Sequence, residues 1–347
     1  MQRQVSVQTK PVPVLDPDKD HDSVIVKVQL AGLCGSDIWV YQGFEECPSG
    51  VTQGHEFIGT IESKGRGVKH LEVGDRVVSP FTTSCGTCWY CTKEMTSRCL
   101  QSQLFGSENL PGGQAEYVKV PLADGTLYKL EDGMTDRIIP EALLLLADVA
   151  PTGLFGVEQA LGHHALRSLK DIEKTIVVVG CGPVGLCAVA AALWRGATVF
   201  AIDDVPERRA WAEKLGARVI GPPEDAVRVI KQATEGRGAD AAVEAVGRPA
   251  ALTLAIECLR PHGVLTSVGV HQTVLPLHGQ EVFNKNLHLS FGRCPARSLI
   301  PKAIQLLQAK DMSFLITHRV ALKEADHYYG EFASHKTGKV LFDMSKR

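Results

Sequence analysis

The stretch "KTIVVVGCGPVGL", residues 174–186, decides the fold of this chain. Its first half is a β-branched apolar run, typical of a strand that is buried on both faces. Gly180, Gly182 and Gly185 follow as G-x-G-x-x-G, where a helix is expected to begin. The first glycine permits a tight turn, the second lets a pyrophosphate approach the backbone, and the third lets the helix lie close to the strand. The stretch therefore predicts a strand–turn–helix unit that binds a dinucleotide.

From about residue 150 to residue 290, apolar strands alternate with helical stretches, as in "LCAVAAALWRGA", "TVFAID", "RRAWAEKLGA" and "AAVEAVG". This alternation predicts an α/β fold with a doubly wound parallel sheet. Asp203 ends the second strand, where an acidic side chain binds the adenosine ribose. We therefore expect NAD(H) as the cofactor, in preference to NADP(H).

The flanking regions have a different pattern. Residues 1–150 contain short alternating runs such as "SVIVKVQLAG", "GTIESKG" and "GDRVVSP", which indicate a β-rich domain. The usual opening strand of such a domain is expected to be short or missing. The C-terminal part contains an amphipathic helix, "SLIPKAIQLLQAKD", and a final strand, "GKVLFD". We expect three regions: a β-rich domain at 1–150, a dinucleotide-binding domain at 151–291, and a C-terminal segment at 292–347.

The composition of the 347 residues excludes several classes of protein. A formal net charge of −2 provides no basic surface for nucleic acid. Glycine and proline interrupt the longest apolar runs, so no membrane-spanning helix is expected. The polar N-terminus has no apolar core of a secretory signal, which predicts a cytoplasmic protein. In that reducing compartment, clustered cysteines are more often metal ligands than disulfides.

Four of the ten cysteines lie within "CGTCWYCTKEMTSRC", residues 85–99. Cys85, Cys88, Cys91 and Cys99 have the spacing C-x2-C-x2-C-x7-C, which lets four thiolates surround one Zn²⁺ ion. The alternative is a set of free or disulfide-bonded cysteines. A site closed by four thiolates has no open position for a substrate. We therefore expect this lobe to be structural, and the reaction to take place elsewhere.

Two further motifs offer ligands for a catalytic zinc. "AGLCGSD" contains Cys34, and "QGHEFIG" contains His55 and Glu56. A catalytic zinc takes a few Cys, His or carboxylate ligands and keeps one position open. Each of these residues alone is weak evidence, because a lone cysteine is usually a core residue. Their joint occurrence with the four-cysteine lobe and the dinucleotide motif favours a zinc-dependent enzyme.

The sequence resembles the zinc-containing medium-chain alcohol dehydrogenases over nearly its whole length. "GHEFIGTIESKGRGV", residues 54–68, fits the family signature G-H-E-x2-G-x5-G-x2-V at every specified position. "LADVAPTG" resembles the segment with the last catalytic ligand, which implies Asp148 in that role. An aspartate there is closest to the secondary-alcohol and formaldehyde-dehydrogenase-like branches. The resemblance implies a GroES-like catalytic domain, a Rossmann domain, and a C-terminal return to the catalytic domain.

The resemblance also implies roles for single residues. It implies a catalytic zinc on Cys34, His55 and Asp148, with Glu56 able to approach the metal or replace a water. Ser36 would take the proton of the alcohol. Other residues are implied in cofactor binding and in the substrate pocket: Thr152 and Val184 at the nicotinamide, Lys339 near the pyrophosphate, and Trp39, Phe81 and Val270 around the substrate. For Phe81 and Val270 an ordinary core position is an equal alternative. Trp39 stands where many relatives have the histidine of a proton relay.

The leading interpretation is a cytoplasmic, NAD-dependent zinc alcohol dehydrogenase with two zinc ions per chain, which forms a homodimer or homotetramer. Its partner is a small alcohol, aldehyde or ketone, and the sequence does not identify which. Two alternatives remain. One is a zinc-free NADPH quinone or enoyl reductase of the same superfamily, which the complete set of zinc ligands disfavours. The other is a non-catalytic dinucleotide-binding protein.

Overall fold

The computed structural model describes residues 5–221 and 223–346 and divides the chain into two compact units. The N-terminal unit combines residues 1–148 with residues 295–347, and the second unit, here called the dinucleotide unit, comprises residues 149–294. The predicted C-terminal segment is thus part of the same unit as the N-terminal residues.

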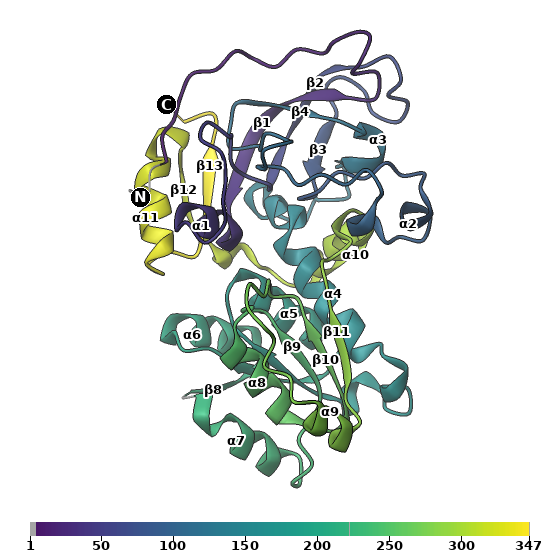
Figure 1. Ribbon diagram of the computed structural model, residues 1–347, viewed down its shortest axis with the longest axis vertical. Helices are drawn as coiled ribbons and strands as arrows, with labels where there is room; N and C mark the ends of the chain where they lie inside the picture. The colour runs from purple at the N-terminus through teal and green to yellow at the C-terminus, as the bar shows by residue number, and fades with distance from the viewer. Residues whose placement is uncertain (1–4, 222, 347) are drawn as a thin grey trace. The chain divides into compact units, whose positions relative to one another are not determined.

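The dinucleotide unit contains a parallel sheet, which over the described residues has six strands in the order β11-β10-β9-β6-β7-β8. Figure 1 labels β8, β9, β10 and β11 of this sheet. The predicted doubly wound order is confirmed, because β6 lies between β7 and β9. Its strands are β6 (Thr175–Val179), β7 (Thr198–Ile202), β8 (Arg218–Ile220), β9 (Ala239–Glu244), β10 (Leu259–Ser267) and β11 (His288–Phe291). Its helices are α4 (Val149–Leu161), α5 (Pro183–Trp194), α6 (Pro206–Leu215), α7 (Ala226–Ala233), α8 (Pro249–Cys258) and α9 (Gly279–Lys285), with short 3-10 turns η3 (His164–Leu166), η4 (Asp171–Glu173) and η5 (Pro223–Asp225).

Helices cover both faces of this sheet, as alternation along β9 shows. Ala242 belongs to a buried cluster with Leu252 and Ile256 of α8. The next residue, Val243, lies against Gly156 of α4, where an added Cβ would approach its side chain to 2.9 Å. Successive residues of a strand point to opposite faces, so α8 and α4 cover different sides of the sheet.

The N-terminal unit contains a sheet that, over the described residues, has seven strands in the order β12-β13-β1-β2-β3-β5, with β4 also paired to β1. Its strands are β1 (Val24–Leu33), β2 (Phe57–Lys64), β3 (Arg76–Ser79), β4 (Tyr117–Val120), β5 (Tyr128–Lys129), β12 (Ile316–Ala321) and β13 (Lys339–Asp343). Its helices are α1 (Gly35–Tyr41), α2 (Trp89–Thr92), α3 (Ala123–Thr126), α10 (Ala296–Ala309) and α11 (Ala325–Ala333), with 3-10 turns η1 (Thr96–Arg98), η2 (Pro140–Ala147), η6 (Ser313–Leu315) and η7 (Leu322–Glu324). Among the described residues, none before Val24 forms a strand, as expected.

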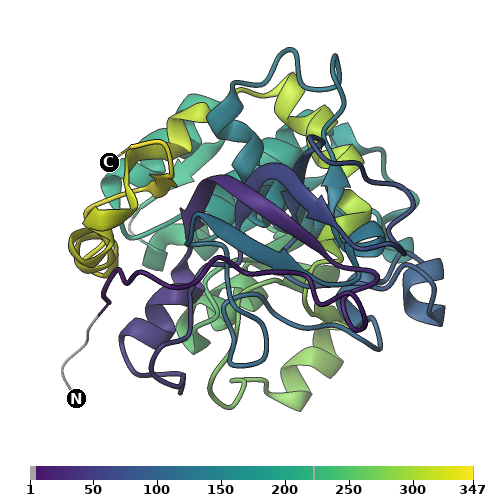
Figure 2. The same ribbon diagram turned by 90° about the horizontal axis from the view of Figure 1, so that it is seen from above.

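The long strand β1 organises this unit. Its residues Val24, Val26 and Val28 are buried in one core cluster, while Lys27 and Gln29 between and after them are exposed. Near its end, β1 pairs antiparallel with β13 from the C-terminal part of the chain. Figure 2 shows this yellow C-terminal segment alongside the purple N-terminal strand. The end of β1 is therefore held in place by β13, which lies about 300 residues away in the sequence.

Among the described residues, no single helix has both the length and the apolar character needed to cross a membrane. One bent pair, Pro140–Ala147 with Val149–Leu161, meets the length and composition criteria together, with a bend of 54° between its parts.

Candidate active site and metal centres

Four potential metal ligands converge in the N-terminal unit. Cys34 follows β1 directly, and His55 and Glu56 directly precede β2. Because β1 and β2 are antiparallel neighbours, the end of one strand meets the start of the other. Asp148 follows η2, and one ligand atom from each of the four residues lies within 4.8 Å of the others. The residues proposed from two separate motifs and the resemblance are thus brought together.

The distances among three of these side chains suit a tetrahedral metal. Asp148 Oδ2 lies 3.7 Å from Cys34 Sγ and 3.6 Å from His55 Nε2. Ligands bound to Zn²⁺ at about 2.0–2.3 Å would be roughly 3.3–3.8 Å apart in a tetrahedral arrangement. A zinc ion therefore fits among these donors without large movements of the side chains.

The charge of the site also favours a cation. Burial alone lowers the pKa of His55, but the carboxylates of Asp37 and Asp148 outweigh this effect and raise the pKa well above its usual value. The two carboxylates thus stabilise the positively charged form of the imidazole. A divalent cation bound to the ring would meet the same negative potential.

Asp37 orients His55 and was not among the predicted site residues. Its Oδ1 lies 3.3 Å from His55 Nδ1, which leaves Nε2 facing the other ligands. Its Oδ2 accepts hydrogen bonds from the Cys34 backbone N–H at 2.9 Å and from Gln114 Nε2 at 3.4 Å. Tyr329 in turn donates to Gln114 Oε1 at 2.7 Å. The C-G-S-D motif gave a signal for Asp37, whereas no local pattern indicated Gln114 or Tyr329.

Glu56 is held by Lys339 from the opposite end of the chain. Both side chains are only about 1% exposed, and the ammonium forms an ion pair with the carboxylate. Burial by itself lowers the pKa of Lys339, but the charge of Glu56 outweighs it and the pKa is raised. In the structure the ammonium of Lys339 contacts Glu56 at the ligand cluster, and the position near a pyrophosphate that the resemblance implied stays a prediction.

The other side chains proposed around the reaction are less uniform in their surroundings. Ser36 is exposed, and its Oγ lies 3.4 Å from His55 Nε2. Trp39 is half-buried and makes an edge-to-face contact with Phe44. Phe81 is 6% exposed within the N-terminal unit, which agrees with a core position. Val270, in the dinucleotide unit, is 60% exposed, so the core alternative is wrong for this residue.

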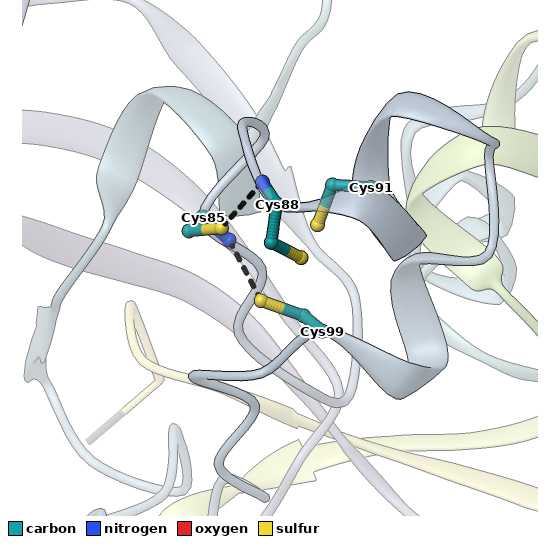
Figure 3. A group of neighbouring side chains, drawn as sticks. All are labelled: Cys85, Cys88, Cys91 and Cys99. Atoms are coloured by element: carbon teal, nitrogen blue, oxygen red, sulfur yellow. Dashed lines mark hydrogen bonds between the residues drawn. The ribbon is translucent and has the colours of Figure 1, made fainter.

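The four-cysteine lobe forms a second ligand cluster in the N-terminal unit. Figure 3 shows the sulfur atoms of Cys85, Cys88, Cys91 and Cys99 turned toward a common centre, all within 4.8 Å of one another. Backbone N–H groups of Cys88 and Cys85 donate to the sulfurs of Cys85 and Cys99 at 3.3 and 3.2 Å. Such bonds stabilise thiolates, so the chain geometry supports a closed four-sulfur metal site.

The thiols in this lobe differ strongly in acidity. Burial raises the pKa of Cys85, but hydrogen bonds from Thr87 and Cys88 outweigh it and lower the pKa to about 6. Burial and the neighbouring Cys88 raise the pKa of Cys91 to about 12. Four sulfurs at this spacing cannot all be thiolates without a compensating cation, and a bound Zn²⁺ would supply that charge.

In the dinucleotide unit, the glycine-rich turn has the geometry that each glycine was expected to provide. Gly180 has φ +93°, a left-handed conformation that favours glycine. A Cβ on Gly185 would lie 1.7 Å from the Gly180 carbonyl oxygen, whereas one on Gly182 would meet no atom within 4 Å. The helix N-terminus beside Gly182 is therefore open to an anion, and the close approach of helix and strand depends on Gly185.

Asp203 lies beside this turn at the end of β7 and is 9% exposed. Its Oδ2 accepts a hydrogen bond from the Cys181 N–H at 2.7 Å, and its Oδ1 accepts one from the Val205 N–H at 2.8 Å. Arg208 lies 3.9 Å from the carboxylate. The backbone thus fixes the carboxylate where the polypeptide leaves the second strand.

The helices that contain Thr152 and Val184, α4 and α5, pack against each other. Gly153 of α4 faces α5, where an added Cβ would lie 2.6 Å from the Val184 carbonyl oxygen. Only a residue without a side chain allows this contact. Gly153 therefore permits the close packing of α4 against α5.

Comparisons with known proteins agree with both units. Residues 20–132 match the family model "Alcohol dehydrogenase GroES-like domain", and residues 183–309 match "Zinc-binding dehydrogenase". A zinc-type alcohol dehydrogenase B of Aspergillus flavus is 40% identical over 97% of this chain and 78% of its own length. A probable zinc-binding alcohol dehydrogenase of Mycobacterium tuberculosis is 35% identical over 97% of this chain and 84% of its own length. The solved structure of the alcohol dehydrogenase from Thermus sp. ATN1 is 32% identical, with a TM-score of 0.89. The match covers 99% of this chain and 97% of the Thermus chain.

Proposed function

Since the chain belongs to the zinc-containing medium-chain dehydrogenase/reductase family and is a zinc-dependent oxidoreductase, we propose that it transfers a hydride between an alcohol and NAD. The reverse reaction would reduce the corresponding aldehyde or ketone. The observation that carries this proposal is the convergence of Cys34, His55 and Asp148 at tetrahedral spacing. This ligand set disfavours a zinc-free quinone or enoyl reductase and a non-catalytic dinucleotide-binding protein.

The proposed catalytic metal is zinc, held by Cys34, His55 and Asp148, which would polarise the substrate oxygen while the dinucleotide accepts the hydride. Asp37 keeps His55 Nε2 turned toward the metal position. Ser36, exposed and 3.4 Å from that nitrogen, would accept the proton of the alcohol as it passes its own hydroxyl proton to solvent. Lys339 neutralises Glu56 and holds its carboxylate in the cluster. The protein groups around the metal position thus bind it, orient its ligands or accept the proton.

We assign a second, structural zinc to Cys85, Cys88, Cys91 and Cys99. Four thiolates fill the coordination sphere of Zn²⁺, so no position remains for a substrate. The N–H···S hydrogen bonds in the lobe support this assignment, because each of them stabilises a negative charge on the sulfur that accepts it.

The preference for NAD rests on Asp203. A carboxylate fixed by two backbone N–H groups can accept hydrogen bonds from ribose hydroxyls and repels a 2′-phosphate. The test is the ratio of kcat/KM with NAD to kcat/KM with NADP. Asp203→Asn keeps one of the two oxygens that accept from the backbone and removes the charge. The ratio should therefore fall by about tenfold, the effect of 1.4 kcal/mol.

Asp204→Asn is the matched control, because Asp204 is the exposed neighbour of Asp203 and its replacement should leave the ratio nearly unchanged. A wild-type preference for NADP would overturn the assignment. We extend the proposal to a homo-oligomer, which native mass measurement tests, and to a cytoplasmic location. A panel of primary, secondary and polyhydric alcohols identifies the substrate.

A further inference from the structure

Three histidines of the dinucleotide unit form a cluster apart from the zinc-ligand residues and the glycine-rich turn. The ring centroids of His163 and His164 are 4.2 Å apart, and His288 lies 4.6 and 5.6 Å from them. One ring nitrogen from each histidine lies within 4.8 Å of the other two. We propose that His163, His164 and His288 form a third metal site, which binds a divalent transition-metal ion.

The fold, not the local sequence, creates this cluster. His163 is the N-cap of the 3-10 turn η3, two residues after the end of α4, and His288 begins β11. The turn η3 packs against β10, the neighbour of β11 in the sheet. Segments more than 120 residues apart in sequence thus present their imidazoles to one another, and a shared metal would link the edge strand to the end of α4.

The site is separate from the cofactor-binding turn. Strands β6, β9, β10 and β11 are parallel, so all of them begin at one end of the sheet and finish at the opposite end. His288 is the first residue of β11, whereas Gly180 follows the last residue of β6. A metal at the histidines therefore lies where the strands begin, whereas the glycine-rich turn lies where they end.

The chemistry of the three donors selects the class of ligand. Neutral imidazoles bind Zn²⁺, Ni²⁺, Co²⁺ and Cu²⁺, whereas Mg²⁺ and Ca²⁺ prefer oxygen. Partial burial, and then the positive charges that His164 and His288 would carry, lower the pKa of His163, which favours the neutral form that binds metals. His164 is exposed, so solvent can complete the coordination sphere.

Binding has an identifiable cost at His163. Its Nδ1 accepts a hydrogen bond from the Ala165 N–H at 3.2 Å, so the proton of the neutral ring lies on Nε2. A metal at Nε2 displaces that proton to Nδ1, and the hydrogen bond to Ala165 is lost. One metal–nitrogen bond thus replaces one hydrogen bond, and binding is expected to be weaker than at the two zinc sites.

Equilibrium dialysis against Ni²⁺ of protein that holds two zinc ions per chain tests the proposal, because elemental analysis distinguishes nickel from the zinc already present. We expect one nickel per chain with the zinc content unchanged. His164→Asn and His288→Asn should each weaken nickel binding by at least about tenfold. His262→Asn is the matched control, since His262 is an exposed histidine of the same unit outside the cluster, and it should bind nickel like the wild type.

A second measurement separates lost binding from lost folding. Nickel should raise the Tm of the wild type and of His262→Asn by mass action, but not that of the two cluster variants. The circular dichroism spectra of these variants without nickel should match that of the wild type. Nickel bound equally well by the cluster variants, or bound only by displacing one of the two zinc ions already present, would overturn the proposal.

Discussion

At the scale of single residues, Asp37 is the group whose replacement most directly tests the geometry of the ligand cluster. It contacts His55 Nδ1 and the Cys34 backbone, and so positions two proposed ligands at once. Asp37→Asn preserves the shape but removes the charge that orients the imidazole. We expect kcat/KM to fall by about 10- to 100-fold, and zinc to be lost more readily to a chelator.

Asp18→Asn, an exposed carboxylate of the same unit, serves as the control for Asp37→Asn and should retain wild-type kcat/KM and zinc. Unchanged chelator sensitivity in Asp37→Asn would contradict the orienting role.

The residue scale also shows where prediction from sequence ends. Cys34 and His55 stand in short motifs with recognisable spacing, and Asp37 belongs to the same motif as Cys34. Glu56 was identified from its motif, but its ion pair with Lys339 joins residues 283 positions apart. Contacts of that range depend on strand order, which no local pattern specifies.

At the scale of secondary-structure elements, the turn between β6 and α5 contains two glycines with different roles. Gly185 is needed for the packing of the helix against the turn, and Gly182 leaves space for the cofactor. Gly185→Ala places a Cβ 1.7 Å from the Gly180 oxygen, so helix and strand must move apart. We expect a loss of at least about 1–3 kcal/mol in the free energy of unfolding, measured by urea denaturation, together with a loss of cofactor binding.

Gly182→Ala is the comparison, because its Cβ meets no protein atom within 4 Å and its φ is −67°. This variant should fold with nearly wild-type stability and bind the dinucleotide more weakly, as measured by isothermal titration calorimetry. Equal destabilisation in both variants would show that the turn does not divide these roles.

The four-cysteine lobe is the second element with a distinct prediction. Cys88→Ala removes one of four sulfurs and should reduce the zinc content from two ions per chain to one. Metal binding and folding are coupled. Free zinc at about 100 times the dissociation constant of the site therefore adds about 2.7 kcal/mol to the free energy of unfolding. We therefore expect a lower Tm. Cys47→Ala, a half-buried cysteine outside the lobe, should keep both zinc ions.

Local patterns predicted these elements well because their signals are local. The β-branched run and the glycines gave β6, its turn and α5, and the C-terminal amphipathic pattern gave α10, which begins two residues earlier than the quoted stretch. The cluster of His163, His164 and His288 was not foreseen, because His288 joins it only through the pairing of β10 with β11.

At the scale of the whole molecule, the chain is organised so that its C-terminal part completes its N-terminal unit. Strand β13 pairs with β1 and β12, and Tyr329 of α11 reaches Gln114 behind the ligand cluster. The proposed zinc ligands therefore depend on segments from both ends of the sequence. The dinucleotide unit, residues 149–294, is a continuous stretch between these segments.

The central claim is that zinc at Cys34, His55 and Asp148 supports hydride transfer between an alcohol and NAD. The most direct measurement is the absorbance of reduced nicotinamide formed from NAD and an alcohol panel, by the wild type and by Cys34→Ala. We predict alcohol-dependent reduction by the wild type, and its loss in Cys34→Ala, with the lobe zinc and the far-ultraviolet circular dichroism spectrum retained. Undiminished turnover in Cys34→Ala, or no turnover of any alcohol, aldehyde or ketone by zinc-loaded wild type, would contradict the account.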